Sequence, residues 1–303
     1  MNLQLIEKVV PADGEVYKPS DPFLAPVVEN RRLTPEDSED VRHIVLDISR
    51  SGMRYVEGQS IGIVPPGVDE KGKRHRPRLY SIASARCGEI GCDIDNKATT
   101  VTLCVKRVVY QDESGQEVRG LASNHLCDAQ PGDDLQMTGP IGRKFLLPAD
   151  DSNHLIMIAV GTGIAPFRAF VQYIYGDHGS WGGKVKLFYG AKTGLETLYM
   201  NEQSNDIGQY YTQETFEAIR ALSREETTES GKRVYVQDKI ARQKDELWTL
   251  IKEGHFCLYI CGLKGMEEGV DQVLSGWASA EGLDWEEMKK GFKDNGRWNV
   301  EVY

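Results

Sequence analysis

Hydrophobic and polar residues alternate in short stretches through the first half of the chain, a period that is typical of half-buried β-strands. The predicted strands are residues 41–48, 60–65, 78–84, 99–110 and 134–140. Turn residues separate them, at 65–67, 114–115 and 131–132. Closely spaced strands with such turns predict an antiparallel barrel or sandwich. Residues 1–30, which prolines and charges interrupt, are predicted to form an arm with little regular structure.

The pattern changes after Pro148, where long apolar runs replace the alternation. Such runs are typical of parallel strands covered on both faces, and they occupy residues 154–160, 185–191 and 256–262. A weaker strand pattern lies at 216–223, and an alternating pattern at 297–303 predicts a final strand. Helical patterns lie at 165–175, 204–211, 238–252, 265–282 and 284–294. Strands that alternate with helices predict a doubly wound parallel sheet. A boundary is therefore predicted near 148–153, between domains at 31–150 and 151–303.

The composition narrows the class of protein. A chain of 303 residues has room for two domains. Its net charge of −10 disfavours a general nucleic-acid binder, because the phosphates would be repelled. No apolar run is long enough to predict a membrane span. The first residues show neither a signal-peptide nor a transit-peptide pattern, so a bacterial cytoplasmic protein is expected, or an organellar stromal one if a transit peptide was removed.

The cysteines are spread along the chain without the spacing of a zinc site, so no metal site is expected. They are predicted to be reduced and mostly buried, as is usual in a cytosolic protein. The six are Cys87, Cys92, Cys104, Cys127, Cys257 and Cys261.

A glycine-rich turn, Gly161-Thr162-Gly163, separates an apolar strand from a helical pattern. Glycines there let a pyrophosphate approach the backbone, and the helix N-terminus offers free N–H groups. Pro166 suits the first turn of that helix, because a residue there has no intrahelical N–H partner to lose. The spacing is not Gly-x-Gly-x-x-Gly, and a purely structural turn explains the motif equally well.

Ser223 and Arg224 follow a strand candidate, where NAD-specific domains commonly carry a carboxylate for the ribose 2′-hydroxyl. A guanidinium there, with Arg233 and Tyr235 shortly after, suits a 2′-phosphate and an adenine ring instead. This composition favours NADP over NAD. Two glutamates come directly after Arg224, however, and a solvated charged loop explains the same residues.

Three further features are weak when each is taken alone. Arg78, Tyr80 and Ser81 lie on one predicted strand, where tyrosine is usually a packing residue. Cys261 stands at the end of a buried strand where ligands bind to parallel sheets, although buried cysteines are usually structural. The strand pattern continues as far as Tyr303, which predicts that the C-terminus is docked rather than frayed.

A basic run precedes the strand of Tyr80, with no acidic residue inside it. Concentrated positive charge in an acidic chain favours a steering surface for an acidic protein partner. An ordinary solvated loop is the alternative. The residues of the run are Lys71, Lys73, Arg74, Arg76 and Arg78.

In their order along the chain, these segments resemble the plant-type ferredoxin–NADP⁺ reductase family from about residue 20 to residue 303. The motifs that carry the resemblance are RLYSIAS (78–84), LCVKRVVY (103–110), LASNHLCD (121–128), GTGIAPF (161–167), SRE (223–225), YICGLKGME (259–267) and VEVY (300–303). The resemblance implies an antiparallel Greek-key β-barrel that binds FAD, followed by a Rossmann-like domain that binds NADP(H). It also implies a monomer that transfers electrons between NADP(H) and a one-electron carrier, ferredoxin or flavodoxin.

The resemblance assigns roles to individual residues. The implied catalytic residues are Ser81, Cys261, Glu301 and Tyr303. The implied FAD-binding residues are Arg78, Leu79, Tyr80, Ser81, Cys104, Val105, Lys106, Tyr110, Leu121, Ala122, Ser123, Thr162 and Tyr303. The implied NADP(H)-binding residues are Lys106, Thr162, Ser223, Arg224, Arg233, Tyr235, Gln237, Gly262, Leu263 and Glu301. The implied partner-binding residues are Lys71, Lys73, Arg74 and Arg76.

The same resemblance implies some geometry. Tyr80 and Tyr303 are expected to cover opposite faces of the isoalloxazine ring, and LASNHLCD to form a turn around the pyrophosphate. Three positions depart from the family pattern: Val160 replaces a usual threonine, Ala122 a usual cysteine and Asn299 a common histidine.

Two other functions stay open at the level of sequence. One is an NADPH-dependent reductase component of an oxygenase system, whose site chemistry would be nearly identical. The other is a non-catalytic nucleotide-binding or redox-sensing protein, against which the intact catalytic set argues. The sequence does not specify the direction of electron flow.

Overall fold

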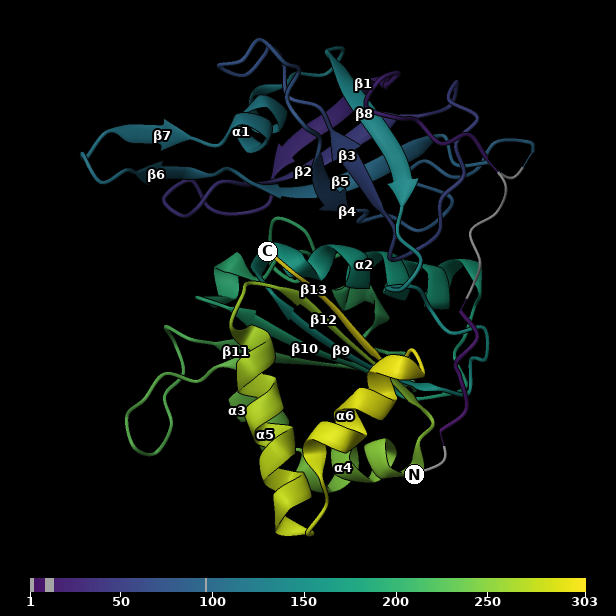
Figure 1. The fold of residues 1–303 in the computed structure, drawn as a ribbon, viewed down its shortest axis with the longest axis vertical. Helices are drawn as coiled ribbons and strands as arrows, with labels where there is room; N and C mark the ends of the chain where they lie inside the picture. The colour runs from purple at the N-terminus through teal and green to yellow at the C-terminus, as the bar shows by residue number, and fades with distance from the viewer. Residues whose placement is uncertain (1–2, 9–13, 96) are drawn as a thin grey trace.

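The chain folds into two domains, each built on its own sheet, in a computed structural model that describes residues 3–8, 14–95 and 97–303 (Figure 1). The upper domain in Figure 1 has an antiparallel sheet from the first half of the chain, and the lower domain has a parallel sheet from the second half. The predicted boundary near 148–153 falls in the connection between these two sheets.

The antiparallel sheet has the strand order β4-β3-β8-β1-β2-β5. The strands are β1 Phe23–Arg32, β2 Val41–Asp47, β3 Ser60–Ile63, β4 Arg78–Ser81, β5 Thr100–Lys106 and β8 Asp134–Ile141. Just after β4 the two ends of the sheet meet: the Ala83 N–H donates to the Thr102 carbonyl over 2.8 Å, and Ile82 pairs with Leu103. The sheet therefore closes into the predicted barrel, whose interior holds fully buried side chains such as Ile44 and Ile61.

Between β5 and β8 the chain leaves the barrel and returns. A two-stranded hairpin, β6 Val109–Gln111 and β7 Glu117–Arg119, projects to the left in Figure 1. Helix α1 Leu121–Asp128 follows and packs against β5. The segment LASNHLCD was predicted to be a turn, and this is wrong: it is this helix.

The parallel sheet has the strand order β11-β10-β9-β12-β13, so the chain first winds one way from β9 and then the other. The strands are β9 His154–Val160, β10 Val185–Ala191, β11 Phe216–Leu222, β12 Phe256–Gly262 and β13 Trp298–Val302. This is the predicted doubly wound topology. The weak pattern at 216–223 is explained by its place, because β11 is an edge strand and its charged residues reach solvent.

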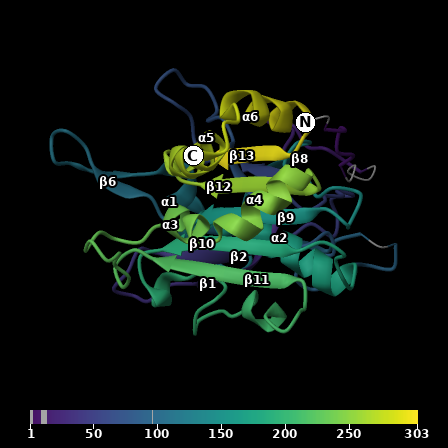
Figure 2. The same ribbon diagram turned by 90° about the horizontal axis from the view of Figure 1, so that it is seen from below.

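Successive residues of each strand point to opposite faces of this sheet, and the two faces bury different clusters. Met157 and Ala159 pack with α2 Ala165–Gln172, on the face toward the barrel. Ile156 and Ile158 pack on the other face, which four helices cover (Figure 2). Those helices are α3 Val236–Ala241, α4 Lys244–Glu253, α5 Met266–Ala280 and α6 Trp285–Asp294.

The buried cluster around α2 continues into the barrel domain. Leu33 and Ala83 of the first domain belong to the same cluster as Phe167 and Tyr199 of the second. Tyr259 of β12 donates a hydrogen bond to the Leu146 carbonyl over 2.7 Å. The two domains therefore share packed surface, and α2 lies at the centre of it.

Several predicted elements differ from the structure. Residues 23–30 are not part of an irregular arm but belong to β1, where Pro26 lies next to an irregularity in the pairing at Val27–Glu29 that spares its missing N–H. Residues 204–211 form no α-helix, only a 3₁₀ turn at Gly208–Tyr210. The helix predicted at 238–252 is two helices, α3 and α4, separated at Arg242–Gln243.

The prediction that all cysteines are reduced is also wrong. Cys87 and Cys92 form a disulfide in the loop between β4 and β5, while the other four cysteines are free and buried. The two cysteines lie five positions apart, a spacing that no sequence motif distinguishes from chance. Within the residues that the structure describes, no helix is long and apolar enough to cross a membrane.

Candidate functional site

The carboxyl ends of β9 and β12 lie side by side at the point where the winding of the sheet reverses. Ligands of doubly wound sheets bind in the crevice at such a point. Gly163 is required by packing, because a Cβ there would lie 2.0 Å from the Cys261 carbonyl oxygen. Gly161 has φ 57° and no heavy atom within 4 Å of the Cβ position, so the approach to its backbone is open. The glycine turn therefore has the structural role that its sequence allowed, and it leaves the backbone at Gly161 open to a ligand.

All four predicted catalytic residues lie at this crevice. Ser81, at the end of β4, donates a hydrogen bond to Glu301 Oε2 over 3.5 Å. Glu301 on β13 is the direct neighbour of Cys261 on β12 in the parallel pairing. Tyr303 follows β13, and its hydroxyl lies within hydrogen-bond distance of the Thr162 hydroxyl. The barrel thus contributes one of these residues and the parallel sheet the other three.

Burial changes the acid–base properties of two of these groups. Burial raises the pKa of Glu301 to about 7, although the hydrogen bond from Ser81 acts in the opposite direction. Burial, followed by the charge of Glu301, raises the pKa of Cys261. Glu301 can therefore exchange a proton near neutral pH, whereas Cys261 stays a neutral thiol.

Several of the residues implied for FAD lie on β4 and on the projecting hairpin of the barrel domain. Arg78 and Leu79 on β4 are exposed, and Tyr80 and Ser81 are partly buried beside them. Tyr110 on the projecting hairpin is 55% exposed. These side chains offer a cation, two aromatic rings and a hydroxyl to a flat, anionic cofactor.

Helix α1 supplies the part of this set that suits a pyrophosphate. Its first backbone bond runs from the Asn124 N–H to the Gly120 carbonyl, so the N–H groups of Leu121, Ala122 and Ser123 have no partner within the helix. Gly120 provides no side-chain cap. The Ser123 hydroxyl itself is engaged with the Val108 N–H over 3.2 Å. Backbone groups at a helix N-terminus are a ready site for phosphate oxygens, so the residues present fit FAD.

Three of the residues implied for FAD have buried or engaged side chains. Cys104 packs in the cluster shared by the two domains, and Val105 packs inside the barrel. Lys106 is exposed, and its ammonium group pairs with Glu39 over 2.6 Å. Cys104 and Val105 can therefore offer a ligand only their backbone, and Lys106 must leave Glu39 to reach one.

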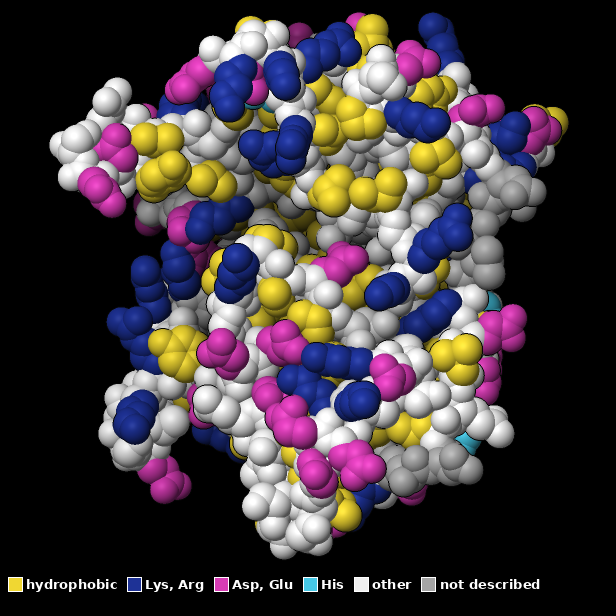
Figure 3. All heavy atoms as spheres, in the orientation of Figure 1, with side chains coloured by type: hydrophobic (Ala, Val, Ile, Leu, Met, Phe, Trp, Pro, Cys, Tyr) yellow, Lys and Arg dark blue, Asp and Glu magenta, His cyan; other side chains and the backbone are white. Residues whose placement is uncertain are grey.

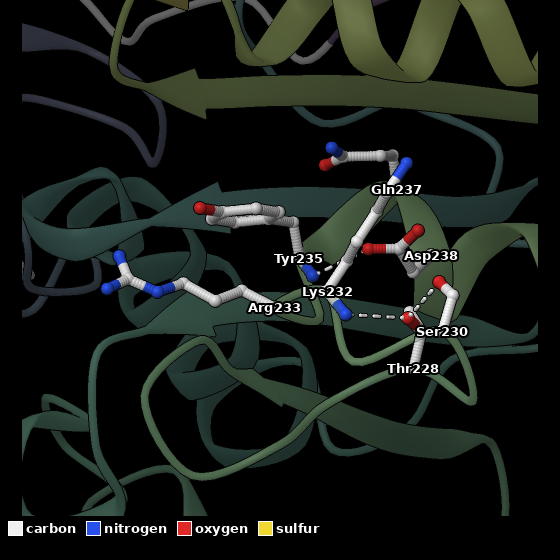
Figure 4. Close-up of a pocket in the computed structure, with 7 residues that line it drawn as sticks. All are labelled: Thr228, Ser230, Lys232, Arg233, Tyr235, Gln237 and Asp238. Carbon is white, nitrogen blue, oxygen red and sulfur yellow. Dashed lines mark hydrogen bonds between the residues drawn. The ribbon is translucent and has the colours of Figure 1, made fainter.

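Three of the residues implied for the 2′-phospho-AMP half of NADP(H), Arg233, Tyr235 and Gln237, line a cavity of about 600 Å³ on the second domain (Figure 4), whereas Ser223 and Arg224 are not among its lining residues. The Tyr235 ring lies in the middle, Arg233 extends along it to one side, and Lys232 rises toward Gln237 on the other. The cavity is lined by Thr228, Ser230, Lys232, Arg233, Tyr235, Gln237 and Asp238.

Three acidic residues near this cavity, Glu225, Glu226 and Asp238, are engaged, which argues against a merely solvated loop. Glu225 accepts from the Gly194 N–H over 2.9 Å. Glu226 accepts from the Leu222 N–H over 3.0 Å and pairs with Lys239. Asp238 accepts from the N–H of Tyr235 over 2.7 Å.

The basic side chains near the cavity, by contrast, do not form ion pairs with these acidic residues. The side chains of Arg224, Lys232 and Arg233 have no ion-pair partner within the part of the chain that the structure describes. Ser223, next to Arg224, donates a long hydrogen bond of 3.3 Å to the Ala191 carbonyl. Positive charge therefore remains available where a 2′-phosphate would bind. The sequence predictions missed Thr228, Ser230 and Lys232, although a hydroxyl-rich TTESGK turn is a signal for anion binding.

The remaining residues implied for NADP(H) follow β12. Gly262 has φ 140°, and a Cβ there would lie 2.8 Å from the Val160 carbonyl oxygen. Leu263, next in the chain, is 55% exposed. The Tyr303 N–H donates to the Gly262 carbonyl over 3.0 Å, which fixes the C-terminus at the crevice as predicted.

The basic run lies on an exposed turn directly before β4. Asp69 Oδ1 accepts from the N–H groups of Lys71 and Lys73, each over 2.9 Å, and thereby fixes the turn. Apolar side chains lie on either side, with Val68 57% and Leu79 59% exposed. Figure 3 shows several Lys and Arg side chains beside exposed hydrophobic atoms over the barrel domain, with Asp and Glu side chains toward its margins. The exposed residues of the turn are Lys71, Lys73, Arg74 and Arg76.

Comparison with known proteins gives this arrangement a family. The family model for the oxidoreductase NAD-binding domain matches residues 157–272. Chloroplastic ferredoxin–NADP reductase, leaf isozyme 1, of Oryza sativa subsp. japonica is 42% identical over 292 residues, covering 95% of this chain and 78% of the relative. This chain belongs to the ferredoxin–NADP reductase family. The ferredoxin–NADP reductase of Picosynechococcus sp. is 43% identical, covering 95% of this chain and 71% of the relative.

The three departures from the ferredoxin–NADP reductase pattern have structural settings. Val160 packs where a Cβ on Gly190 would approach it to 3.1 Å. Ala122 is buried in α1. The Asn299 amide donates to the Leu258 and Gly296 carbonyls, each over 3.2 Å, inside the sheet. None of these side chains replaces a member of the catalytic set. Across residues 3–8, 14–95 and 97–303, no three acidic, His or Cys side chains form a group suited to a metal ion.

Proposed function

We propose that this protein transfers electrons between NADP(H) and a ferredoxin-type one-electron carrier, with FAD as the intermediate carrier. The observation that carries the proposal is the meeting of Ser81 from the barrel with Cys261 and Glu301 from the parallel sheet. It joins a crevice suited to FAD to a crevice suited to a nicotinamide nucleotide. The relatives named above are all ferredoxin–NADP reductases, and no observation favours an oxygenase component over that function.

Bound FAD supplies the chemistry that the side chains lack, because it exchanges a hydride with NADP(H) and single electrons with a carrier protein. The protein supplies orientation. Hydride transfer requires the two rings in a close, aligned contact. Tyr80 and the Tyr303–Thr162 pair are proposed to border the place where the rings would meet, which the position of Tyr80 on β4 and the contact of Tyr303 with Thr162 support. Tyr303 would then have to move aside before the nicotinamide could occupy that place.

Glu301 and Ser81 are proposed to hold and transfer a proton beside the contact between the flavin and nicotinamide rings. The Glu301 carboxyl has a pKa of about 7 because it is buried, and the Ser81 hydroxyl bridges it to the barrel side of the crevice. The pair can hold a proton at Glu301 Oε2 and pass it through Ser81 Oγ. Cys261, a neutral thiol beside Glu301, is proposed to contact the nicotinamide ring.

NADP(H) is proposed to bind with its 2′-phosphate among Ser223, Arg224 and Arg233 and its adenine on Tyr235, next to Gln237. The basic side chains at this cavity that form no ion pair support the choice of NADP over NAD. Leu263 and Gly262 are proposed to border the path of the nucleotide from this cavity to Cys261.

The basic turn before β4 is proposed to receive the carrier protein. An acidic carrier, whether ferredoxin or flavodoxin, complements four exposed cations. We further propose that the protein acts as a monomer, in a bacterial cytoplasm or an organellar stroma.

The test begins with the purified protein, which is expected to be yellow and to reduce an artificial acceptor with NADPH. The rate with NADH should be far lower at equal concentration. Anaerobic stopped-flow mixing with ferredoxin and with flavodoxin, in both directions, then identifies the carrier. A colourless protein, or one that uses NADH as well as NADPH, overturns the proposal.

A further inference from the structure

The loop between β4 and β5 carries an accessible pair of sulfur atoms. Cys87 and Cys92 form a disulfide, with their Cα atoms 4.6 Å apart. Both residues are partly exposed, whereas the other four cysteines are buried. Ile90 within the loop is 70% exposed and Ile94 just beyond it is fully exposed. A reagent or a partner protein can therefore reach this disulfide without unfolding the chain.

The loop that this disulfide closes holds a carboxylate aimed at the other domain. Glu89 Oε1 lies 2.5 Å from Arg168 Nη1, and Glu89 Oε2 lies 3.1 Å from Nη2. The Thr102 hydroxyl donates to the same carboxylate over 3.0 Å. The Glu89 N–H donates to the Thr100 hydroxyl over 2.9 Å. Glu89 is thus fixed by β5 on one side and by the disulfide-closed loop on the other.

Arg168 on α2 joins the two domains. Its side chain is 2% exposed, and it donates to the Ala83 carbonyl over 2.7 Å. It also pairs with Asp206 and lies 4.7 Å from the centre of the Tyr199 ring. Glu89 and Ala83 belong to the barrel domain, while Asp206 and Tyr199 belong to the other. A buried guanidinium that loses one carboxylate is strongly destabilised, so this group depends on Glu89.

A second charged contact lies on the other side of Cys87. Arg86 pairs with the buried carboxylate of Glu57 over 2.7 Å. Its guanidinium carbon lies 4.0 Å from the centre of the Tyr173 ring, directly after α2. The residues on both sides of Cys87 therefore contact α2 and its extension. Because α2 follows the Gly161–Ile164 turn, its position also sets the position of Thr162.

We infer that Cys87 and Cys92 form a dithiol–disulfide exchange site, and that its redox state controls how firmly Glu89 holds Arg168. A thiolate of a protein dithiol attacks one sulfur and forms a mixed disulfide, which its second thiol then resolves. Cys87 and Cys92 gain two electrons and two protons, and the partner dithiol becomes a disulfide. The reduced loop is free to open, and the turn that carries Thr162 loses a support. This inference rests on the hydride transfer proposed above.

The exposed isoleucines favour one kind of reductant. Ile90 and Ile94 place apolar surface beside the sulfur atoms, which suits a small protein dithiol better than a charged thiol peptide such as glutathione. Dithiothreitol serves as the chemical probe. Thioredoxin and glutathione, each at the same reducing potential, then distinguish the two sources of thiol.

The experiment uses the FAD-loaded protein. Thiol counting after denaturation should find four free thiols before dithiothreitol treatment and six after it, in agreement with one disulfide. After anaerobic removal of the reagent, stopped-flow measurement should show hydride transfer from NADPH slowed about threefold to tenfold, because small misalignments of reacting groups lower the rate steeply. Thioredoxin should act faster than glutathione. Oxidation should restore the rate.

Two variants separate this role from a merely structural disulfide. The double variant Cys87→Ser, Cys92→Ser should have the slow rate and no response to dithiothreitol. Glu89→Gln should be slow in both redox states, because the contact through which the disulfide acts is already weakened. Six free thiols in the untreated protein, a normal rate after complete reduction, or an unchanged response in Glu89→Gln overturns the inference. If NADPH reduces no bound FAD at all, the proposed function has failed instead.

Discussion

At the scale of single residues, the ionised carboxylate of Glu301 lowers the stability of the fold, while its raised pKa suits proton transfer. Its carboxyl is partly buried beside Ser81 and Cys261, and its pKa of about 7 lies above the ordinary value of 4.5. The folded protein therefore binds a proton that the unfolded chain releases between these two pH values. Stability consequently falls as the pH rises through this window and changes no further above it.

Glu301→Gln removes this titration. We expect the variant to match the parent in stability near pH 4.5 and to exceed it increasingly up to about pH 7, because the amide carries no charge to bury. Urea unfolding at a series of pH values measures the difference. Glu286→Gln, at an exposed carboxylate of α6, is the matched control and should track the parent. A constant difference across the pH range would contradict the assignment of the raised pKa to Glu301.

Tyr303 is a second residue whose contribution, here to NADP⁺ binding, can be measured with a single substitution. It is 57% exposed at the end of the chain, held by the Thr162 hydroxyl and the Gly262 carbonyl. If it covers the flavin, the nicotinamide must displace it. Aromatic stacking contributes about 0.5–1.5 kcal/mol beyond burial, so its loss corresponds to a change in affinity of up to roughly tenfold.

We expect Tyr303→Ser to tighten NADP⁺ binding by up to about tenfold and to slow turnover with the carrier protein, because product release then limits the rate. Difference spectroscopy during NADP⁺ titration gives the affinity. Tyr211→Ser, at another exposed tyrosine, controls for the loss of a surface ring. Unchanged NADP⁺ affinity in Tyr303→Ser would refute the displacement.

At the scale of elements, the segment from β11 to the end of α3 carries arginines in two different settings. Arg233 and Lys232 line the cavity that contains Tyr235. Arg242, which follows α3, lines a neighbouring hollow together with Glu229 and does not line that cavity. Arg242 therefore offers a guanidinium of equal charge as a control for Arg233.

Arg233→Ala should raise the KM for NADPH by about tenfold to a hundredfold, because a hydrogen bond to a charged group contributes about 1.5–3 kcal/mol. The KM for NADH, which lacks the 2′-phosphate, should be unchanged. Arg242→Ala is the matched control and should leave both constants as they are. Steady-state kinetics with the two nucleotides decides the matter, and an equal loss with both would show that Arg233 does not contact that phosphate.

At the scale of the whole molecule, an acidic protein carries a concentrated patch of positive charge on its surface. The chain carries a net charge of −10, yet the turn before β4 presents four exposed cations without an acidic residue among them. A field of this kind speeds the encounter with an acidic protein and is screened by salt.

We expect the double variant Lys73→Glu, Arg74→Glu to associate with ferredoxin about tenfold more slowly at low ionic strength, with the difference shrinking as salt is added. Hydride transfer from NADPH should be unaffected. Lys290→Glu, on exposed surface of α6 in the other domain, is the control for a change in net charge. Stopped-flow association across a salt series measures the effect. An association rate independent of salt would contradict steering by this turn.

The two kinds of sheet and most of their strands could be predicted from the amino-acid sequence alone. This was possible because periodicity is local: alternation marks a half-buried strand, and a continuous apolar run marks a strand covered on both faces. The sequence also supplied Ser223, Arg224, Arg233 and Tyr235 as a set, because these residues lie close together in the chain. The errors fell where local patterns are ambiguous, as in the Pro-containing strand β1 and the helix α1.

Contacts between residues far apart in the chain became known from the folded structure. Ser81 and Glu301 are 220 positions apart, and Glu89 and Arg168 are 79 apart. No local period encodes such contacts, because they depend on how the two domains pack. The contact of Glu225 with Gly194 belongs to the same class, whereas the pairing of Cys87 with Cys92 is local and simply follows no sequence motif. The burial of a side chain, its hydrogen-bond partners and its pKa depend on residues that folding brings around it. For that reason they can be read only from the structure.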